Sequence, residues 1–92
     1  MNKISRPTFL VSFGRDVEDK YIEIFGGARS AGGVHYFESD SFYKIMERLD
    51  KAFLKEQEFG VWDPDEDSFV RTSFSKFKNA KDTCKYYVKD FV

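Results

Sequence analysis

A short segment near the amino terminus carries apolar residues at alternate positions. Within residues 8–14, Phe9, Val11 and Phe13 fall on one side of a two-residue period, and two hydroxyl residues fall on the other side. Side chains of a β-strand point to opposite faces in turn, so this pattern predicts a strand with one buried face. Such a strand must belong to a sheet that is covered on that face by other elements.

Two further segments are predicted to extend this sheet. Residues 15–19 are charged and read as a turn, and residues 20–25 are rich in β-branched and aromatic residues and read as a second strand, paired with the first as a hairpin. The glycine-rich residues 26–33 then form a loop, and residues 34–38 form a third strand. Connections this short favour antiparallel pairing, because a parallel crossover needs about a dozen residues or more.

The clearest helical pattern follows the third strand. Ser39, Asp40 and Ser41 offer a choice of N-cap residues, and Gly60 offers a stop. Between them the apolar residues are spaced by three and four positions: Phe42, Ile45, Met46, Leu49, Ala52 and Phe53. This spacing predicts one amphipathic helix with a solvated opposite face.

The carboxyl-terminal third predicts a turn, a short strand and a second helix. Residues 61–68 form an acidic turn around a proline. Residues 68–74 are assigned to a short edge strand, and the alternative is an early turn of the last helix. The second helix is expected from Ala80 to near the end of the chain, with Cys84 as a small buried residue on its apolar face.

Size and composition indicate one compact domain over residues 1–92. The chain is 41% hydrophobic and contains eleven Phe residues, enough for one core without disulfides. We therefore predict an α+β fold, a small antiparallel sheet of three to four strands with two helices packed on one face. The longest apolar runs are three residues, too short for a membrane helix or a secretion signal, and this indicates a cytoplasmic protein.

The scarcity of catalytic residue types argues against an enzyme. The chain has one His (His35) and one Cys (Cys84), so it offers no zinc cluster and no Cys–His pair with redundancy. His35 is expected to be a satisfied or solvated histidine rather than a catalytic base. We predict no catalytic residues, no cofactor and no metal.

Two segments resemble ligand-binding motifs only in part. The alternate aspartates Asp63, Asp65 and Asp67 match the opening of a calcium-binding EF-hand loop, but Ser68 and Phe74 replace its required glycine and glutamate. The glycines of residues 26–33 lack the Lys and Ser or Thr that end a nucleotide-binding P-loop. Neither segment therefore predicts a small-molecule site.

The charges are separated along the chain although the total is only −1. Residues 1–37 hold five basic and four acidic side chains, residues 38–67 hold four and ten, and residues 68–92 hold six and two, which gives +1, −6 and +4. The acidic middle predicts a surface for a basic protein partner, anchored by an indole ring: Trp62, Asp63, Asp65, Glu66 and Asp67. The alternatives are a core position for the indole and a solvated acidic turn for the carboxylates.

The basic residues predict contacts with a partner or its RNA. On the expected last helix, three lysines spaced by four form one ridge, and other cations lie near its start: Arg71, Lys76, Lys78, Lys81, Lys85 and Lys89. Arg29 sits in the loop of residues 26–33, where it either reaches a groove on a partner or belongs to a flexible hairpin tip. A solvated helix face remains the alternative for the lysine ridge.

Four segments together resemble small phage anti-CRISPR proteins, and most closely the inhibitors of type I-F systems. They are residues 1–7, the glycine-rich loop 26–33, the helix start 39–46 and the tail 85–92. The resemblance implies a non-enzymatic inhibitor in the cytoplasm of the bacterial host cell. It would bind the multi-subunit, RNA-guided surveillance complex, with or without direct contact to the guide RNA, and block hybridisation of target DNA. The alternative is a small nucleic-acid-binding accessory domain that uses the basic carboxyl-terminal helix.

Overall fold

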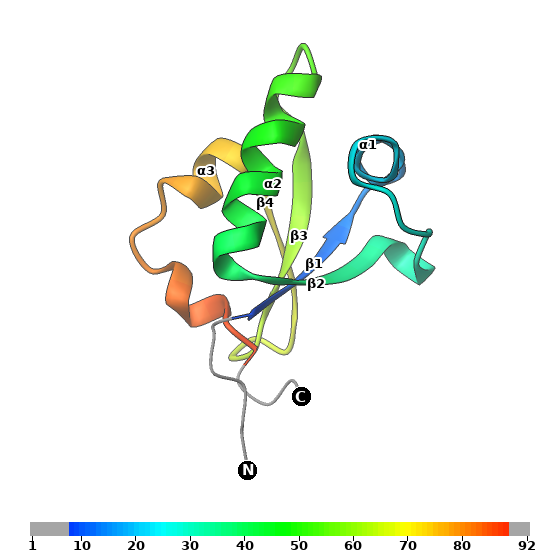
Figure 1. The fold of residues 1–92 in the computed structure, drawn as a ribbon. Coiled ribbons are helices and arrows are strands. Elements are labelled where there is room, and N and C mark those ends of the chain that lie inside the picture. Colours follow the sequence, from blue (N-terminus) through cyan, green and yellow to red (C-terminus); the bar gives the residue numbers. More distant parts are fainter. Residues whose placement is uncertain (1–7, 89–92) are drawn as a thin grey trace.

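The computed structural model describes residues 8–88 as a sheet with helices on one side (Figure 1). The strands are β1 (Thr8–Phe13), β2 (Val34–Glu38), β3 (Glu58–Asp63) and β4 (Ser68–Ser73); the helices are α1 (Arg15–Phe25), α2 (Ser39–Ala52) and α3 (Phe74–Lys78); two 3-10 turns are η1 (Ala31–Gly33) and η2 (Thr83–Tyr86). The predicted α+β fold class is confirmed.

All strand pairs in the sheet are antiparallel, in the spatial order β2-β1-β3-β4. In the central pair, Val11 lies opposite Val61 and Phe13 lies opposite Phe59. Residues directly opposite each other share a face, so these apolar residues all point to the same side of the sheet. That side is the one the helices cover.

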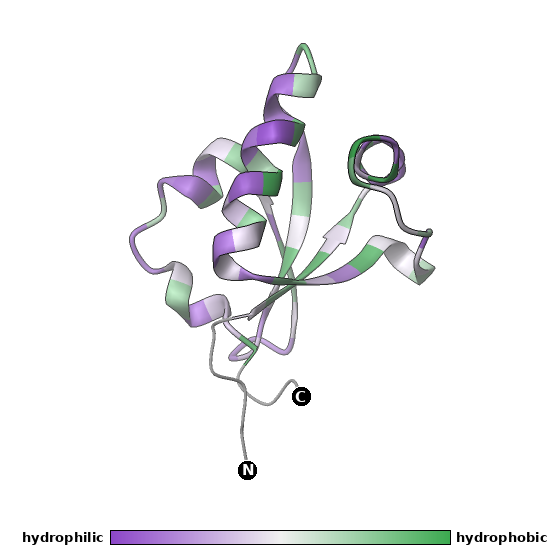
Figure 2. Cartoon of the chain, viewed as in Figure 1, coloured by the Kyte–Doolittle hydropathy of each residue, from purple (hydrophilic) through white to green (hydrophobic). Residues whose placement is uncertain are grey.

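The core is built mainly from aromatic rings that meet between sheet and helices. The fully buried ring of Phe9 lies 5.6 Å from the ring of Phe42 on α2 and 5.1 Å from the ring of Phe77 on α3. Hydrophobic positions recur between hydrophilic ones along α2 (Figure 2), and Phe42, Met46 and Leu49 are its buried residues. The amphipathic helix expected after the third strand is therefore confirmed, although it ends at Ala52.

The hairpin predicted from residues 20–25 is wrong, because this segment belongs to α1. The charged residues 15–19 form its first turns, and Val17, Tyr21 and Ile24 are spaced to pack on one side. The helix ends at a glycine: Gly26 has a φ of +87° and donates its N–H to the Ile22 carbonyl at 2.8 Å. Six residues with alternating character were too few to separate a strand from a helix.

The sequence analysis predicts no strand between α2 and the acidic turn, but β3 lies there. Gly60 does not end α2; it lies in the middle of β3, opposite Arg71 of β4. The short strand predicted at residues 68–74 is confirmed as β4. Residues 61–63, assigned to the acidic turn, are the second half of β3.

The long last helix is also wrong in the part that the structure describes. The chain forms the short helix α3, capped by the Ser73 hydroxyl, and then turns through η2. Tyr87 forms a bridge with Phe9, and the Val88 N–H donates to the Thr8 carbonyl at 2.9 Å. This edge of β1 is available because the β1–β3 register covers only residues 11–13 of β1. Lys89 and the residues after it lie outside the described range.

Candidate binding surface

The side of the sheet opposite the core is not covered by any helix within residues 8–88. Its central residues come from all four strands, and we call it the open face: Leu10, Ser12, Val34, Tyr36, Glu58, Gly60, Trp62, Phe69 and Arg71. Tyr36 is 48% exposed and Phe69 is 39% exposed, whereas the inward Phe residues of the strands are buried. The open face therefore presents aromatic surface to solvent.

Cross-strand pairing brings the aromatic residues of this face together. Trp62 lies directly opposite Phe69, with ring centroids 5.1 Å apart and planes at 76°. Leu10 lies opposite Tyr36 on the other side of the sheet centre. Trp, Tyr and Arg are the residue types enriched at the energetic centres of protein interfaces, and all three occur here.

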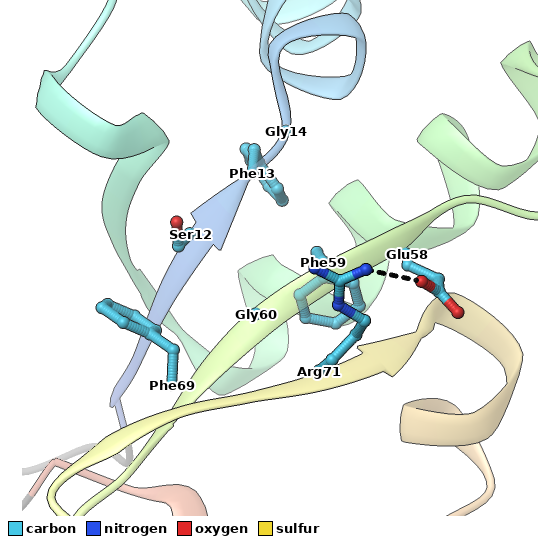
Figure 3. Close-up of a pocket in the computed structure, with 8 residues that line it drawn as sticks. All are labelled: Ser12, Phe13, Gly14, Glu58, Phe59, Gly60, Phe69 and Arg71. Carbon is cyan, nitrogen blue, oxygen red and sulfur yellow. Dashed lines mark hydrogen bonds and ion pairs between the residues drawn. The ribbon is translucent and has the colours of Figure 1, made fainter.

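A pocket of about 390 Å³ opens over Gly60 in the middle of the open face (Figure 3). Phe69 stands on one side of it and the ion pair of Arg71 with Glu58 on the other. A Cβ on Gly60 would lie 3.3 Å from the Phe69 Cβ and 3.6 Å from the Ser12 Cβ. The backbone of Gly60 is not in the left-handed region, so the glycine serves the close approach of Phe69 and not a turn.

The hairpin between β3 and β4 presents the acidic residues at one end of the sheet. Asp63 is buried, and its Oδ1 accepts the N–H groups of Asp65 at 3.0 Å and Glu66 at 3.4 Å. Asp67 follows with a φ of +54°. Asp63 thus holds the turn, as aspartates commonly do. The exposed carboxylates of the turn, which we call the hairpin tip, are Asp65, Glu66 and Asp67.

A second hollow separates the hairpin from the carboxyl-terminal segment. It has a volume of about 480 Å³, and Trp62, Pro64 and Lys85 line it together with Cys84. Cys84 is exposed, which corrects the expectation of a buried thiol inside a helix. The reason is that residues 83–86 form a 3-10 turn, so the helical face that would have buried the thiol does not exist.

Arg29 is engaged within the protein. Its loop joins α1 to β2 rather than two strands, and its guanidinium pairs with Asp19 and lies 3.7 Å from Glu18. Its side chain is still 54% exposed. Contact of Arg29 with a partner stays a prediction, but the arginine also has a structural role that its place in a glycine-rich loop does not reveal.

Glu18 is the centre of a buried polar cluster beneath this loop. Its side chain is 6% exposed and accepts the Ser30 N–H and the His35 ring nitrogen, both at 2.9 Å. The pKa of Glu18 is held below its usual value, chiefly by the hydrogen bond from Ser30 and then by the hydrogen bond with His35. His35 is therefore a satisfied histidine, as the sequence predicts, packed beside the rings of Tyr21 and Phe37.

Within residues 8–88, the remaining basic residues do not share one helix face, and the third lysine of the predicted ridge, Lys89, lies outside this range. Lys76 and Lys78 are exposed on α3, and Lys81 and Lys85 follow in separate turns. Lys85 places its Nζ 5.0 Å from the ring centroid of Tyr86. Arg71 is the only member of the basic set that lies on the open face among the residues described, and it pairs there with Glu58.

The comparisons with known proteins found no protein similar to this chain. Comparison with protein-family models, with curated proteins and with solved structures found no match. Within residues 8–88, no cluster of three or more His, Cys, Asp or Glu side chains is arranged to hold a metal ion. No helix in the same range has the length and apolar character needed to cross a membrane.

Several residues of the open face were not singled out from the sequence. Tyr36, Glu58, Gly60 and Phe69 lie on strand positions that point away from the core. The signal was present in β3, where Phe59, Val61 and Asp63 alternate with Glu58, Gly60 and Trp62. Because a glycine in this position is also typical of a helix end, the alternation by itself does not predict the strand.

Proposed function

We propose that the protein is a non-enzymatic inhibitor that binds a bacterial RNA-guided CRISPR surveillance complex and blocks hybridisation of target DNA with the guide RNA. The resemblance of four segments to phage anti-CRISPR proteins names the target class. The observation that carries the binding mode is the open face, an aromatic sheet surface without a covering helix in the described chain.

The charge of this surface supports a basic protein as the partner. The open-face side of the strands and the hairpin tip carry five acidic side chains against Arg71, and the exposed Lys85 lies at the hollow beside Trp62, which gives −3 in all: Glu38, Glu58, Asp65, Glu66 and Asp67. RNA-guided complexes hold the heteroduplex in a positively charged channel. An acidic face docked on that channel would occupy the Lys and Arg side chains that target DNA needs.

Inhibition by binding requires a fixed stoichiometry, whereas inhibition by an enzyme does not. One molecule of inhibitor silences one binding site, so inhibition of target-DNA binding should rise linearly with added protein and saturate near one equivalent per site. Activity should return when the protein is washed from an immobilised complex. Silencing of a molar excess, with activity still lost after removal, would overturn the proposal.

Capture from lysate is the first experiment. The tagged protein is passed through lysate of a bacterium that expresses a type I-F complex, and a ribonucleoprotein of Cas subunits with guide RNA should be retained at moderate salt. Retention of bare RNA or DNA instead, with affinity falling steeply with salt, would favour the nucleic-acid-binding alternative. That alternative has lost its stated basis, since residues 80–88 do not form the basic helix.

A further inference from the structure

We propose that the pocket over Gly60 receives an arginine side chain of a basic protein partner, with the guanidinium stacked on Phe69 and paired with Glu58. This inference rests on the proposed function, because it names the chemistry by which the open face would hold its partner. Nothing in the resemblance points to this pocket; it follows from the geometry of β3 and β4.

The pocket offers the two contacts that a guanidinium uses. Arginine stacks its planar group on aromatic faces and donates in a fork to carboxylates. Phe69 is 39% exposed and borders the pocket, and the Glu58 carboxylate lies at the same pocket with its side chain 58% exposed. Gly60 leaves the space between them open (Figure 3). A lysine has no planar group and would use only part of this arrangement.

Arg71 shows that the site accepts a guanidinium. Its Nη1 lies 3.4 Å from Glu58 Oε1, and its side chain is 80% exposed. An ion pair this exposed contributes little to stability, so its exchange for a partner's arginine costs little. The resident side chain thus occupies one edge of the pocket without filling it.

The surrounding charge favours a protein over a nucleic acid. Exposed aromatic rings on a sheet also suit unpaired bases, which stack on such rings. A nucleic acid, however, brings one phosphate with every base, and the strands and hairpin tip on this side carry a net −3 when the neighbouring Lys85 is included. Those carboxylates repel phosphates and attract Lys and Arg, so the occupant that matches both the rings and the charge is a basic protein surface.

The test measures the preference for arginine over lysine in solution. A fluorescent oligoarginine peptide, an oligolysine peptide of equal length and a single-stranded oligouridine RNA are titrated against the full-length protein at several salt concentrations. We expect the arginine peptide to bind about fivefold more tightly than the lysine peptide, as a guanidinium stacked on a ring at an exposed site implies. Equal affinity of the two peptides for the native protein would overturn the proposal.

Variants at the pocket locate the preference. Phe69→Leu keeps apolar bulk but removes the ring face, Glu58→Gln removes the charge, and Gly60→Ala narrows the floor. Each should reduce the arginine preference to near unity. Matched controls off the open face are Phe25→Leu, at a Phe with 44% exposure on α1, and Glu47→Gln on α2, and both should keep the native preference.

The outcomes separate this inference from the proposed function. A preference that survives all three pocket variants overturns the pocket, even if the surveillance complex is captured. A preference that is lost in the pocket variants and kept in the controls supports the pocket, even if no such complex is captured. Tight binding of the oligouridine RNA that is lost in Phe69→Leu would replace the arginine with a nucleobase.

Discussion

Replacing Glu18 by Gln should destabilise the protein by about 2 kcal/mol at neutral pH, since charged hydrogen bonds contribute about 1.5–3 kcal/mol and the amide retains part of them. The side chain is 6% exposed and accepts the Ser30 N–H and the His35 ring nitrogen. The variant keeps the size of Glu18 and one acceptor oxygen, but it removes the charge that faces Arg29. For a domain of this length the loss lowers Tm by roughly 10 °C.

The effect must also depend on pH in a defined direction. The pKa of Glu18 lies below its usual value in the folded protein, chiefly because of the Ser30 hydrogen bond and then the His35 hydrogen bond. The carboxylate therefore adds stability above the unfolded-state pKa, and this stability is lost as the pH falls through the lower folded-state pKa. The difference between native protein and variant should be full at neutral pH and shrink as the pH falls below about 4.5.

Urea unfolding at a series of pH values, followed by far-UV circular dichroism, measures this difference. Asp16→Asn is the matched control, because Asp16 is also an acidic residue in the first turn of α1 but is exposed. It should cost only the helix-dipole share, about 0.3–1 kcal/mol. An equal loss in the two variants, or a Glu18→Gln difference that persists unchanged in acid, would refute the role assigned to the buried cluster.

Other predictions concern the core and the turns. Phe9→Ala should cost about 3–5 kcal/mol, because Phe9 is fully buried at the centre of the ring cluster, and urea unfolding measures it. Gly33→Ala should cost roughly 1–3 kcal/mol, seen as a lower Tm, because its φ is +68° and a Cβ would meet the Phe13 carbonyl. Asp63→Ala should cost about 1–2 kcal/mol through lost turn hydrogen bonds, whereas Asn and Gln at the hairpin tip should leave Tm nearly unchanged. Added calcium should not raise Tm, and a rise would revive a metal-binding role for the hairpin.

The sequence predicts the fold class because two of its patterns span enough residues to be decisive. The first strand is fixed by Phe9, Val11 and Phe13, and α2 is fixed by apolar spacing over four turns. The segment of α1 fails because its charged first turns look like a loop when judged without the packing of Val17. The carboxyl-terminal segment fails for another reason, since a long-range bridge from Tyr87 to Phe9 outweighs local helical spacing.

The candidate site was recoverable from the sequence only in fragments. The hairpin tip and Trp62 were identified by charge and residue type, which do not depend on tertiary structure. The strand that contains Arg71 is predicted, but its place on the open face follows from pairing with Gly60, in a strand that the sequence does not predict. Gly60 itself has no side chain that could indicate a site. Its role becomes apparent only when the neighbouring Phe69 and Ser12 are known, since a Cβ at Gly60 would contact both.

The alternation of the strands separates stability from recognition in this protein. Inward residues such as Val61 are fully buried in the core, and the residues next to them along the same strand, such as Trp62, belong to the open face. A substitution on the open face removes little buried area, so it should change binding more than folding. Gly60 is an exception that affects both binding and folding. Its small size leaves room for the pocket, and its backbone pairs with both β1 and β4. When Gly60 is replaced by Ala, the stability of the variant must therefore be measured together with its binding, so that a loss of affinity can be separated from a loss of folded protein.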